Sequence, residues 1–164
     1  MVKQSEKRQT ASTQAFYSKS FKDGLGILND EIQLAFQWQR PSILLAVHNS
    51  ILSQVKAQHA LELEIIKSNK KVTRVKADSK SPDVISTICR TSNRQEIVFF
   101  VSELGNVEDP LVLEIFHALN MHRELLVEQQ IRVVFWLTKL EAANLPHYAP
   151  DFWAFRHRVV EFAR

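Results

Sequence analysis

Three short, dense apolar runs, separated by segments with helical or alternating patterns, set the strongest limit on what this chain can fold into. The runs cover residues 42–47, 97–101 and 133–137. A continuous apolar run of about four to eight residues suits a strand that is buried on both faces, as in a parallel sheet. None of the runs approaches the roughly 18 apolar residues that a membrane span needs, so we expect no contact with a membrane.

The segments before and after the first run show helical spacing, and a strand alternation follows. Apolar residues recur at three- and four-residue intervals from Leu25 to Phe36, and again in a helix that Asn49 or Ser50 caps. Residues 71–76 alternate with period two, which predicts a strand with one exposed side near a sheet edge. The second helix carries one apolar stripe, formed by Leu52, Val55, His59, Leu63 and Ile66.

The second half of the chain continues the alternation. A short helix is expected at 81–89, a longer one at 109–128, and a final strand at 158–162. This order predicts a three-layer α/β fold, with a mostly parallel five-stranded sheet and helices on both faces. We expect a single domain over residues 23–164, preceded by a flexible, polar and basic N-terminal arm at residues 1–22.

Three residue types, cysteine, glycine and histidine, exclude whole classes of site. The single cysteine, Cys89, rules out a disulfide framework and a cysteine-based zinc site, and its apolar neighbours favour a buried thiol over a nucleophile. The first ten residues are too polar for a secretory signal, so we expect a cytoplasmic protein. With only three glycines, a glycine-rich phosphate loop is hard to build. The histidines do not show the spacing of a helical metal pair, so we predict no metal site.

Polar residues that directly follow the apolar runs are the first candidates for a site, because ligands of open parallel sheets bind beyond the carboxyl ends of the strands. Asn49 and Ser50 follow the first run, Glu103 follows the second, and Thr138 follows the third. Nucleotide hydrolases use an acid and a neighbouring polar residue in such places to hold magnesium and to sense the γ-phosphate. The other interpretation is that Glu103 is simply a solvated loop residue that follows a buried strand.

The phosphate loop of a nucleotide hydrolase is missing. Residues 48–53 read His-Asn-Ser-Ile-Leu-Ser, with no glycine and no lysine before a serine or threonine. We therefore do not expect an enzyme, and we expect no cofactor. The alternative is a divergent domain that binds ATP or GTP with magnesium, in which Glu103, Thr138, Asn49 and Ser50 face the nucleotide.

Charge is concentrated in two opposed segments. Residues 65–95 have a balance of +6, and residues 96–128 have a balance of −6. Opposed charges of this kind favour a protein partner or a homo-oligomer, with Lys71, Arg74 and Arg123 as candidate contact residues. A third hypothesis is nucleic-acid binding through residues 67–94. It is not preferred, because no aromatic residues are interleaved there for base stacking.

The stretch of residues 149–158 is aromatic and charged and contains no glycine. Trp153 and Arg156 are residue types that are enriched at interaction hot spots, which favours a contact surface. The interpretation that we prefer is a packed corner, in which Phe152, Trp153 and Phe155 close the sheet and Arg156 pairs with an acid such as Asp151.

The last third of the chain also contains several distinctive short sequences. They are Ala118-Leu119-Asn120, Arg123-Glu124, residues 132–137, residues 149–153 with Arg156, and Val160-Glu161-Phe162. In these sequences the chain resembles the N-terminal module of bacterial tetratricopeptide-repeat proteins, which itself resembles the core of signal-transduction P-loop ATPases. The resemblance spans about residues 25–164. It implies the P-loop ATPase strand order, with Glu103 at the Walker B position and Thr138 at the sensor position, and a degenerate version of that fold, because the Walker A loop is missing.

These features together predict a non-catalytic module. We expect a protein-interaction or sensing module of a bacterial signalling assembly, built on a degenerate P-loop-ATPase-like fold. The divergent nucleotide-binding domain stays the alternative, and nucleic-acid binding is the third hypothesis.

Overall fold

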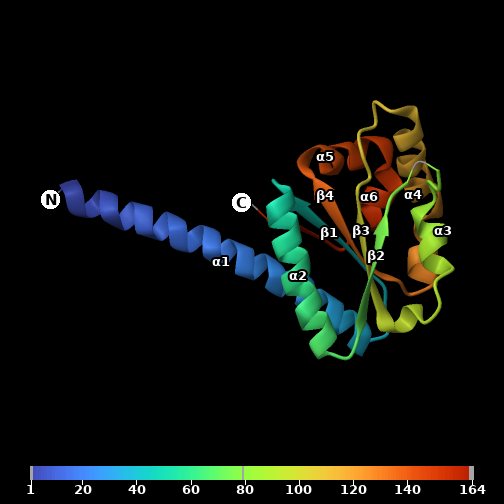
Figure 1. Ribbon diagram of the computed structural model, residues 1–164, viewed down its shortest axis with the longest axis horizontal. Helices are drawn as coiled ribbons and strands as arrows, with labels where there is room; N and C mark the ends of the chain where they lie inside the picture. Colours follow the sequence, from blue (N-terminus) through green and yellow to red (C-terminus); the bar gives the residue numbers. More distant parts are fainter. Residues whose placement is uncertain (1, 79, 163–164) are drawn as a thin grey trace.

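A computed structural model describes residues 2–78 and 80–162, and the side chains of residues 20–78 and 80–162. It contains a five-stranded sheet in which every pair of neighbouring strands is parallel. The sheet order is β2-β3-β4-β1-β5 (Figure 1). The strands are β1 (Ser42–His48), β2 (Lys71–Lys76), β3 (Ile97–Ser102), β4 (Arg132–Thr138) and β5 (Arg158–Phe162).

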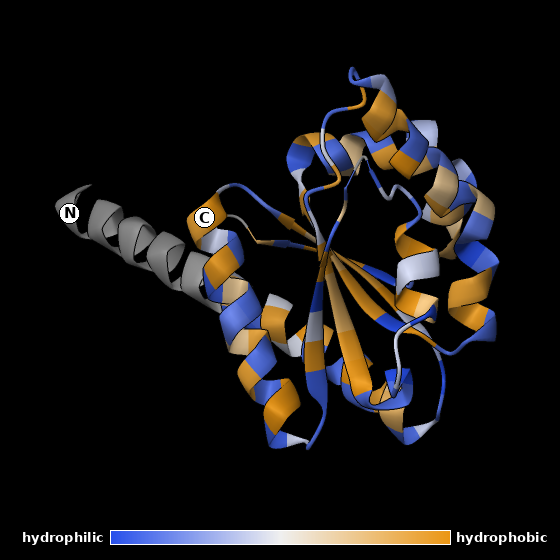
Figure 2. Ribbon diagram, turned by 45° about the vertical axis from the view of Figure 1, so that its right-hand side comes forward, coloured by the Kyte–Doolittle hydropathy of each residue, from blue (hydrophilic) through white to orange (hydrophobic). Residues whose placement is uncertain are grey.

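Helices cover both faces of the sheet (Figures 1 and 2). Helices α1 (Val2–Gln37) and α2 (Ile51–Lys67) lie on one face, and α3 (Val84–Cys89), α4 (Pro110–Glu128), α5 (Lys139–Tyr148) and α6 (Pro150–Phe155) lie on the other. Side chains that alternate along β1 enter different cores, because Ile43 and Leu45 pack toward α3–α6 whereas Leu44 and Ala46 pack toward α1 and α2. The three-layer α/β prediction is confirmed.

Burial along the strands follows the two sequence patterns. Every residue of β1 is buried, and so are five of the six residues of β3, because these strands have neighbours on both sides and helices on both faces. Strand β2 pairs only with β3, and none of its residues is fully buried. Lys71, Arg74 and Lys76 are exposed, and the other three residues are half-buried. The prediction that residues 71–76 lie at a sheet edge is therefore confirmed.

The order of the strands creates one special position in the sheet. The connection from β1 to β2 passes over β4 and β3 through α2, and the connections from β2 to β3 to β4 return through α3 and α4. Because parallel crossovers are right-handed, connections that run in opposite directions lie on opposite faces. The chain thus leaves the neighbouring strands β1 and β4 toward opposite faces. Open α/β sheets bind their ligands at such a switch point.

Helix α1 reaches further toward the N-terminus than the sequence predicted. It spans Val2–Gln37 instead of starting near Leu25. Phe21 belongs to the packed domain, because its ring lies edge-on to Phe162 with 5.3 Å between the centroids. The side chains of residues 1–19, most of the predicted flexible arm, lie outside the described residues. A Cβ atom on Gly24 would lie 2.8 Å from Cγ1 of Val160, so this glycine allows α1 to approach β5 closely.

Candidate functional site

A cleft of about 540 Å³ lies at the switch point between β1 and β4. We call it the switch cleft. Its lining comes from the junctions of β1 with α2 and of β4 with α5: His48, Asn49, Ser50, Ile51, Thr138, Lys139 and Leu140. The structure thus brings together three of the four residues that the sequence suggested as nucleotide-facing, namely Asn49, Ser50 and Thr138.

Helices α2 and α5 begin at the switch cleft, and each is capped by a residue that lines it. Ser50 Oγ accepts a hydrogen bond from the Ser53 backbone N–H at 3.1 Å, and Thr138 Oγ1 accepts one from the Glu141 N–H at 3.1 Å. Only Asn49 and Ser50 separate β1 from α2. A loop of two residues cannot wrap a phosphate chain, since a Walker A loop has four residues between its two glycines alone.

A buried carboxylate that the sequence analysis missed supports the cleft. Glu141 is 5% exposed. One of its oxygens accepts a hydrogen bond from the Thr138 N–H at 2.8 Å, and the other accepts one from the Gly105 N–H at 2.7 Å. Glu141 therefore joins the start of α5 to the loop after β3. The spacing of Thr138 and Glu141, three residues apart before a helix, is the capping-box signal that could have identified it.

His48 ends β1 and lies almost completely buried at the cleft, with 6% of its surface exposed. Its Nδ1 atom has no hydrogen-bond partner among the described residues. Burial lowers the pKa of His48, while the charge of Glu141 and a hydrogen bond with the Ser50 backbone act in the opposite direction. The imidazole is therefore neutral at physiological pH.

Glu103, in contrast, is not a lining residue of the switch cleft. Its backbone adopts a left-handed conformation, with φ of 63°, immediately after β3. The carboxylate lies 3.8 Å from the Lys76 ammonium at the end of β2, and both side chains are exposed. Because β2 and β1 lie on opposite sides of β3 and β4, this carboxylate is directed away from Asn49 and Ser50.

The corner between α4 and α6 holds three other candidate residues. The Arg156 guanidinium stacks on the Trp153 ring at 3.9 Å and donates to the Trp153 carbonyl at 2.7 Å. Arg123 lies 4.0 Å from the Asp151 carboxylate, the partner that the sequence analysis gave to Arg156. Phe152 is fully buried beneath them. These contacts within the chain favour the packed corner over a contact surface.

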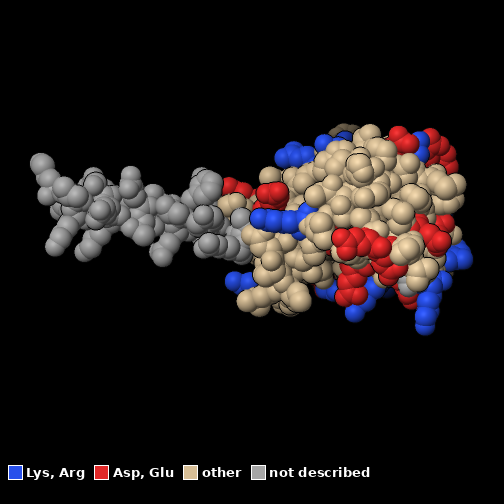
Figure 3. All heavy atoms as spheres, turned by 90° about the horizontal axis from the view of Figure 1, so that it is seen from above, with Lys and Arg blue, Asp and Glu red and all other residues tan. Residues whose placement is uncertain are grey.

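The basic segment is partly neutralised by acids. Figure 3, which views the molecule from above, shows both signs of charge scattered over that face. Arg74, one of the two candidate contact residues of β2, forms an ion pair with Glu62 at 2.6 Å, and Lys71 is exposed at the start of the strand. The other pairs are Lys67–Glu64 at 2.9 Å, Lys70–Glu96 at 2.8 Å and Lys76–Glu103 at 3.8 Å. The nucleic-acid hypothesis gains no support from this arrangement.

Helix α2 has apolar side chains on two opposite sides. The side that packs on the sheet presents Ser53, Ala57, Leu61 and Ile65. Since consecutive residues are about 100° apart around a helix, the stripe found in the sequence lies on the opposite side. All five of its members are exposed. Ile51, the first residue of α2, is also exposed and lines the switch cleft. We call this stripe together with Ile51 the α2 surface: Ile51, Leu52, Val55, His59, Leu63 and Ile66.

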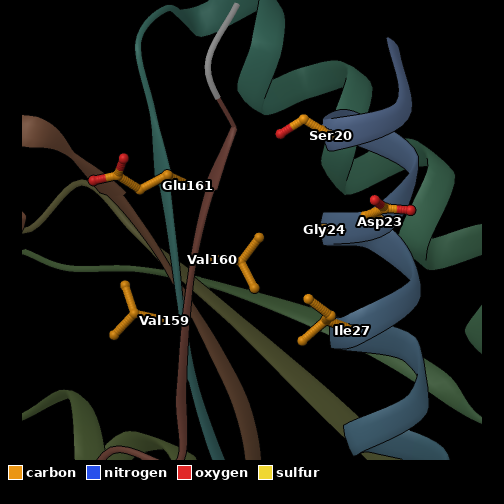
Figure 4. A pocket seen from close by; sticks show the side chains of 7 residues that line it. All are labelled: Ser20, Asp23, Gly24, Ile27, Val159, Val160 and Glu161. Atoms are coloured by element: carbon orange, nitrogen blue, oxygen red, sulfur yellow. The ribbon is translucent and has the colours of Figure 1, made fainter. Parts of the chain in front are cut away.

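A second groove, of about 380 Å³, runs between α1 and the free edge of β5 (Figure 4). Val160 points toward α1, whereas Val159 and Glu161 point to the other side of the strand. The remaining lining residues come from α1: Ser20, Asp23, Gly24 and Ile27.

No group of three or more metal-ligating side chains occurs in this groove or elsewhere in the described part of the chain. Within that same part, none of the helices has the length and apolar character to cross a membrane.

Neither a family model nor a curated protein matches the chain.

Proposed function

We propose that this chain is a non-catalytic protein-interaction module and that the α2 surface is where it contacts its partner. The observation that carries this proposal is the concentration of exposed apolar side chains on one helix. Of the twelve large hydrophobic side chains that are exposed among the described residues, five belong to α2. Single exposed hydrophobic residues are ordinary, but a contiguous group marks a contact surface. Covering it contributes roughly 25 cal/mol per Å² of apolar area.

The site also supports a protein ligand over a nucleotide. Where a phosphate-binding loop places glycine, lysine and a hydroxyl, this chain begins α2 with Ile51 and Leu52, which are 78% and 73% exposed. Our proposal therefore keeps the wider expectation of an interaction or sensing module in a bacterial signalling assembly, on a degenerate P-loop-ATPase-like fold. It also keeps a cytoplasmic setting, since the single cysteine, Cys89, has no second cysteine in the chain to pair with.

The test is co-purification from native cells, with the retained proteins identified by mass spectrometry. The tagged full chain is compared with a Leu52→Ser, Leu63→Ser double variant and with Val159→Ser, which makes the same kind of apolar-to-serine change at an exposed residue of β5. We expect a specific protein to be retained by the wild type and by Val159→Ser but lost from the double variant. Equal retention of every protein by all three chains would refute the proposal.

The switch cleft supports a second candidate, an anionic ligand such as ATP or GTP with magnesium. Two helices begin there, and helix N-termini bind anions through free N–H groups and the helix dipole. Lys139 adds a positive charge to the lining.

Thermal unfolding at increasing nucleotide concentration tests this second candidate, because a ligand that binds only the folded state raises the midpoint. Lys139→Ala should weaken the rise. Glu103→Gln should leave it unchanged, because the Glu103 carboxylate lies beside Lys76. No rise at millimolar nucleotide would refute this candidate and leave the interaction proposal untouched.

A further inference from the structure

We infer that the partner of the α2 surface is a second copy of this chain, and that the α2 surface of one copy binds the outer side of helix α4 of the next. The inference rests on the proposed function and names the partner of the same surface. It is carried by the charges and exposed apolar side chains of two helices on opposite faces of the sheet.

The α2 surface lies in a basic region. Helix α2 and the neighbouring edge strand β2 carry five cations against two acids, a net charge of +3. Arg74 of β2 reaches α2 through its 2.6 Å ion pair with Glu62, so the edge strand borders the helix directly. The region combines an apolar stripe with the cations Lys56, Lys67, Lys71, Arg74 and Lys76 and the acids Glu62 and Glu64.

Helix α4 presents a complementary surface. Apart from Pro110 and Val127, its exposed residues recur every three or four positions and so form a stripe along the helix. Leu111 and Met121 supply apolar contact area, and the only arginine of the helix, Arg123, is turned toward Asp151. The exposed stripe therefore contains three glutamates and no Lys or Arg: Leu111, Glu114, His117, Met121, Glu124 and Glu128.

The positions of α2 and α4 in the fold determine how the α2 surface and the exposed stripe of α4 can come into contact. Because α2 and α4 cover opposite faces of the sheet, they can touch only between different copies. A symmetric contact between two α2 surfaces would bring two basic regions together, and juxtaposed like charges disfavour association. The α2–α4 contact brings opposite charges together instead. It joins two different surfaces, so it adds copies head to tail and yields a ring or an open chain.

Sedimentation velocity over a range of protein concentrations tests the inference. Leu63→Glu places an acid opposite the glutamates of α4, and Met121→Lys places a cation opposite the basic region. Both side chains are exposed, at 48% and 73%, so neither change disturbs the core. We expect the wild type to associate as its concentration rises, and each variant alone to associate at least about tenfold more weakly, a change that corresponds to about 1.4 kcal/mol.

An equimolar mixture of the two variants is the decisive measurement. Leu63→Glu leaves α4 intact and Met121→Lys leaves the α2 surface intact, so one α2–α4 contact can still form between the two chains. The mixture should give dimers and nothing larger. Val159→Glu, a charge placed at an exposed site of β5, should associate like the wild type.

Three results would overturn the inference. A wild type that stays monomeric at the highest concentration would refute self-association, while α2-dependent retention of a different protein would still support the proposed function. A wild type that associates while the variant mixture stays monomeric would refute the α2–α4 contact. A Met121→Lys variant that associates as strongly as the wild type, with Leu63→Glu alone weakened, would also refute it and would indicate a symmetric contact between two α2 surfaces.

Discussion

Individual residues at the carboxyl ends of the strands hold the candidate site in shape. Glu141 is a carboxylate taken out of water, which costs free energy unless hydrogen bonds replace the lost hydration. Two backbone N–H groups, those of Thr138 and Gly105, do so here, and the N-terminus of α5 adds a favourable dipole. This one side chain thereby fixes both the loop after β3 and the wall of the switch cleft that Thr138 forms.

Replacing Glu141 with Gln should destabilise the fold by about 2 kcal/mol. The amide keeps one acceptor oxygen, but its NH₂ group would face a backbone N–H donor, which leaves a buried donor without a partner. Urea unfolding measures the change in the free energy of unfolding. Glu124→Gln is the matched control, because Glu124 is exposed on α4 and the same change there should stay within about 0.5 kcal/mol. Equal effects of the two variants would contradict the role given to Glu141.

His157 makes the stability depend on pH. Its Nδ1 accepts a hydrogen bond from the Ile43 N–H at 2.8 Å, which requires the neutral ring. Burial lowers the pKa of His157, with smaller and opposed effects of Glu31 and Arg40. Burial lowers the pKa of His48 as well. The unfolded chain therefore binds more protons below pH 6.5, and the stabilisation is fully present above that pH and lost as the pH falls through the folded pKa values.

We expect the free energy of unfolding to fall between pH 7 and pH 5, as measured by urea unfolding at several pH values. The lowered carboxyl pKa values of Glu62 and Glu96 lie below 4.5, so those groups contribute only at more acidic pH. His157→Asn should reduce the pH dependence, because its Oδ1 can accept the Ile43 hydrogen bond without titrating. An unchanged slope in that variant would show that His157 is not the titrating group.

At the scale of helices and strands, sequence patterns predicted the strands whose positions follow from burial alone. The apolar runs identified β1, β3 and β4, and the period-two pattern identified the edge strand β2. The side of α2 that faces the sheet could not be predicted, because the helix has apolar residues on two opposite sides. The side that packs on the sheet is the one that contains the small residues Ser53 and Ala57. The direction of Glu103 depends on a left-handed backbone, which apolar periodicity does not reveal.

The orientation of α2 leads to a direct comparison between two leucines of one helix. Leu61 is buried against the sheet, and Leu63 is exposed on the α2 surface. Leu61→Ala should cost about 3 kcal/mol, because it removes buried methyl groups and leaves a cavity. Leu63→Ala should stay within about 0.5 kcal/mol. Urea unfolding of both variants is the measurement, and helix propensity is matched because each replaces leucine by alanine. Similar losses would mean that α2 packs through a different side.

At the scale of the whole molecule, the strand order determines where each surface lies. Placing β4 between β3 and β1 brings the ends of β1 and β4 together, so that the switch cleft forms there. The sequence identified most residues at these strand ends, but not which ends are neighbours, because sheet order depends on contacts between distant segments. The start of the domain also depends on a contact between distant segments, because Phe21 packs on Phe162, the final residue of β5.

Two shortened chains test where the domain begins. One lacks residues 1–19, and the other lacks residues 1–24, which ends close to the boundary that the sequence predicted. The second loses the edge-on contact of Phe21 with Phe162, whose ring stacks in turn on Trp136 at 6.2 Å between centroids. We expect it to be less stable than the first by about 2 kcal/mol, from lost apolar burial and a lost aromatic pair. Thermal unfolding should show a midpoint lower by several degrees, and Phe21→Ala in the longer chain should reproduce most of that shift. Equal midpoints for the two shortened chains would place Phe21 outside the cooperative unit and support the domain boundary predicted from the sequence.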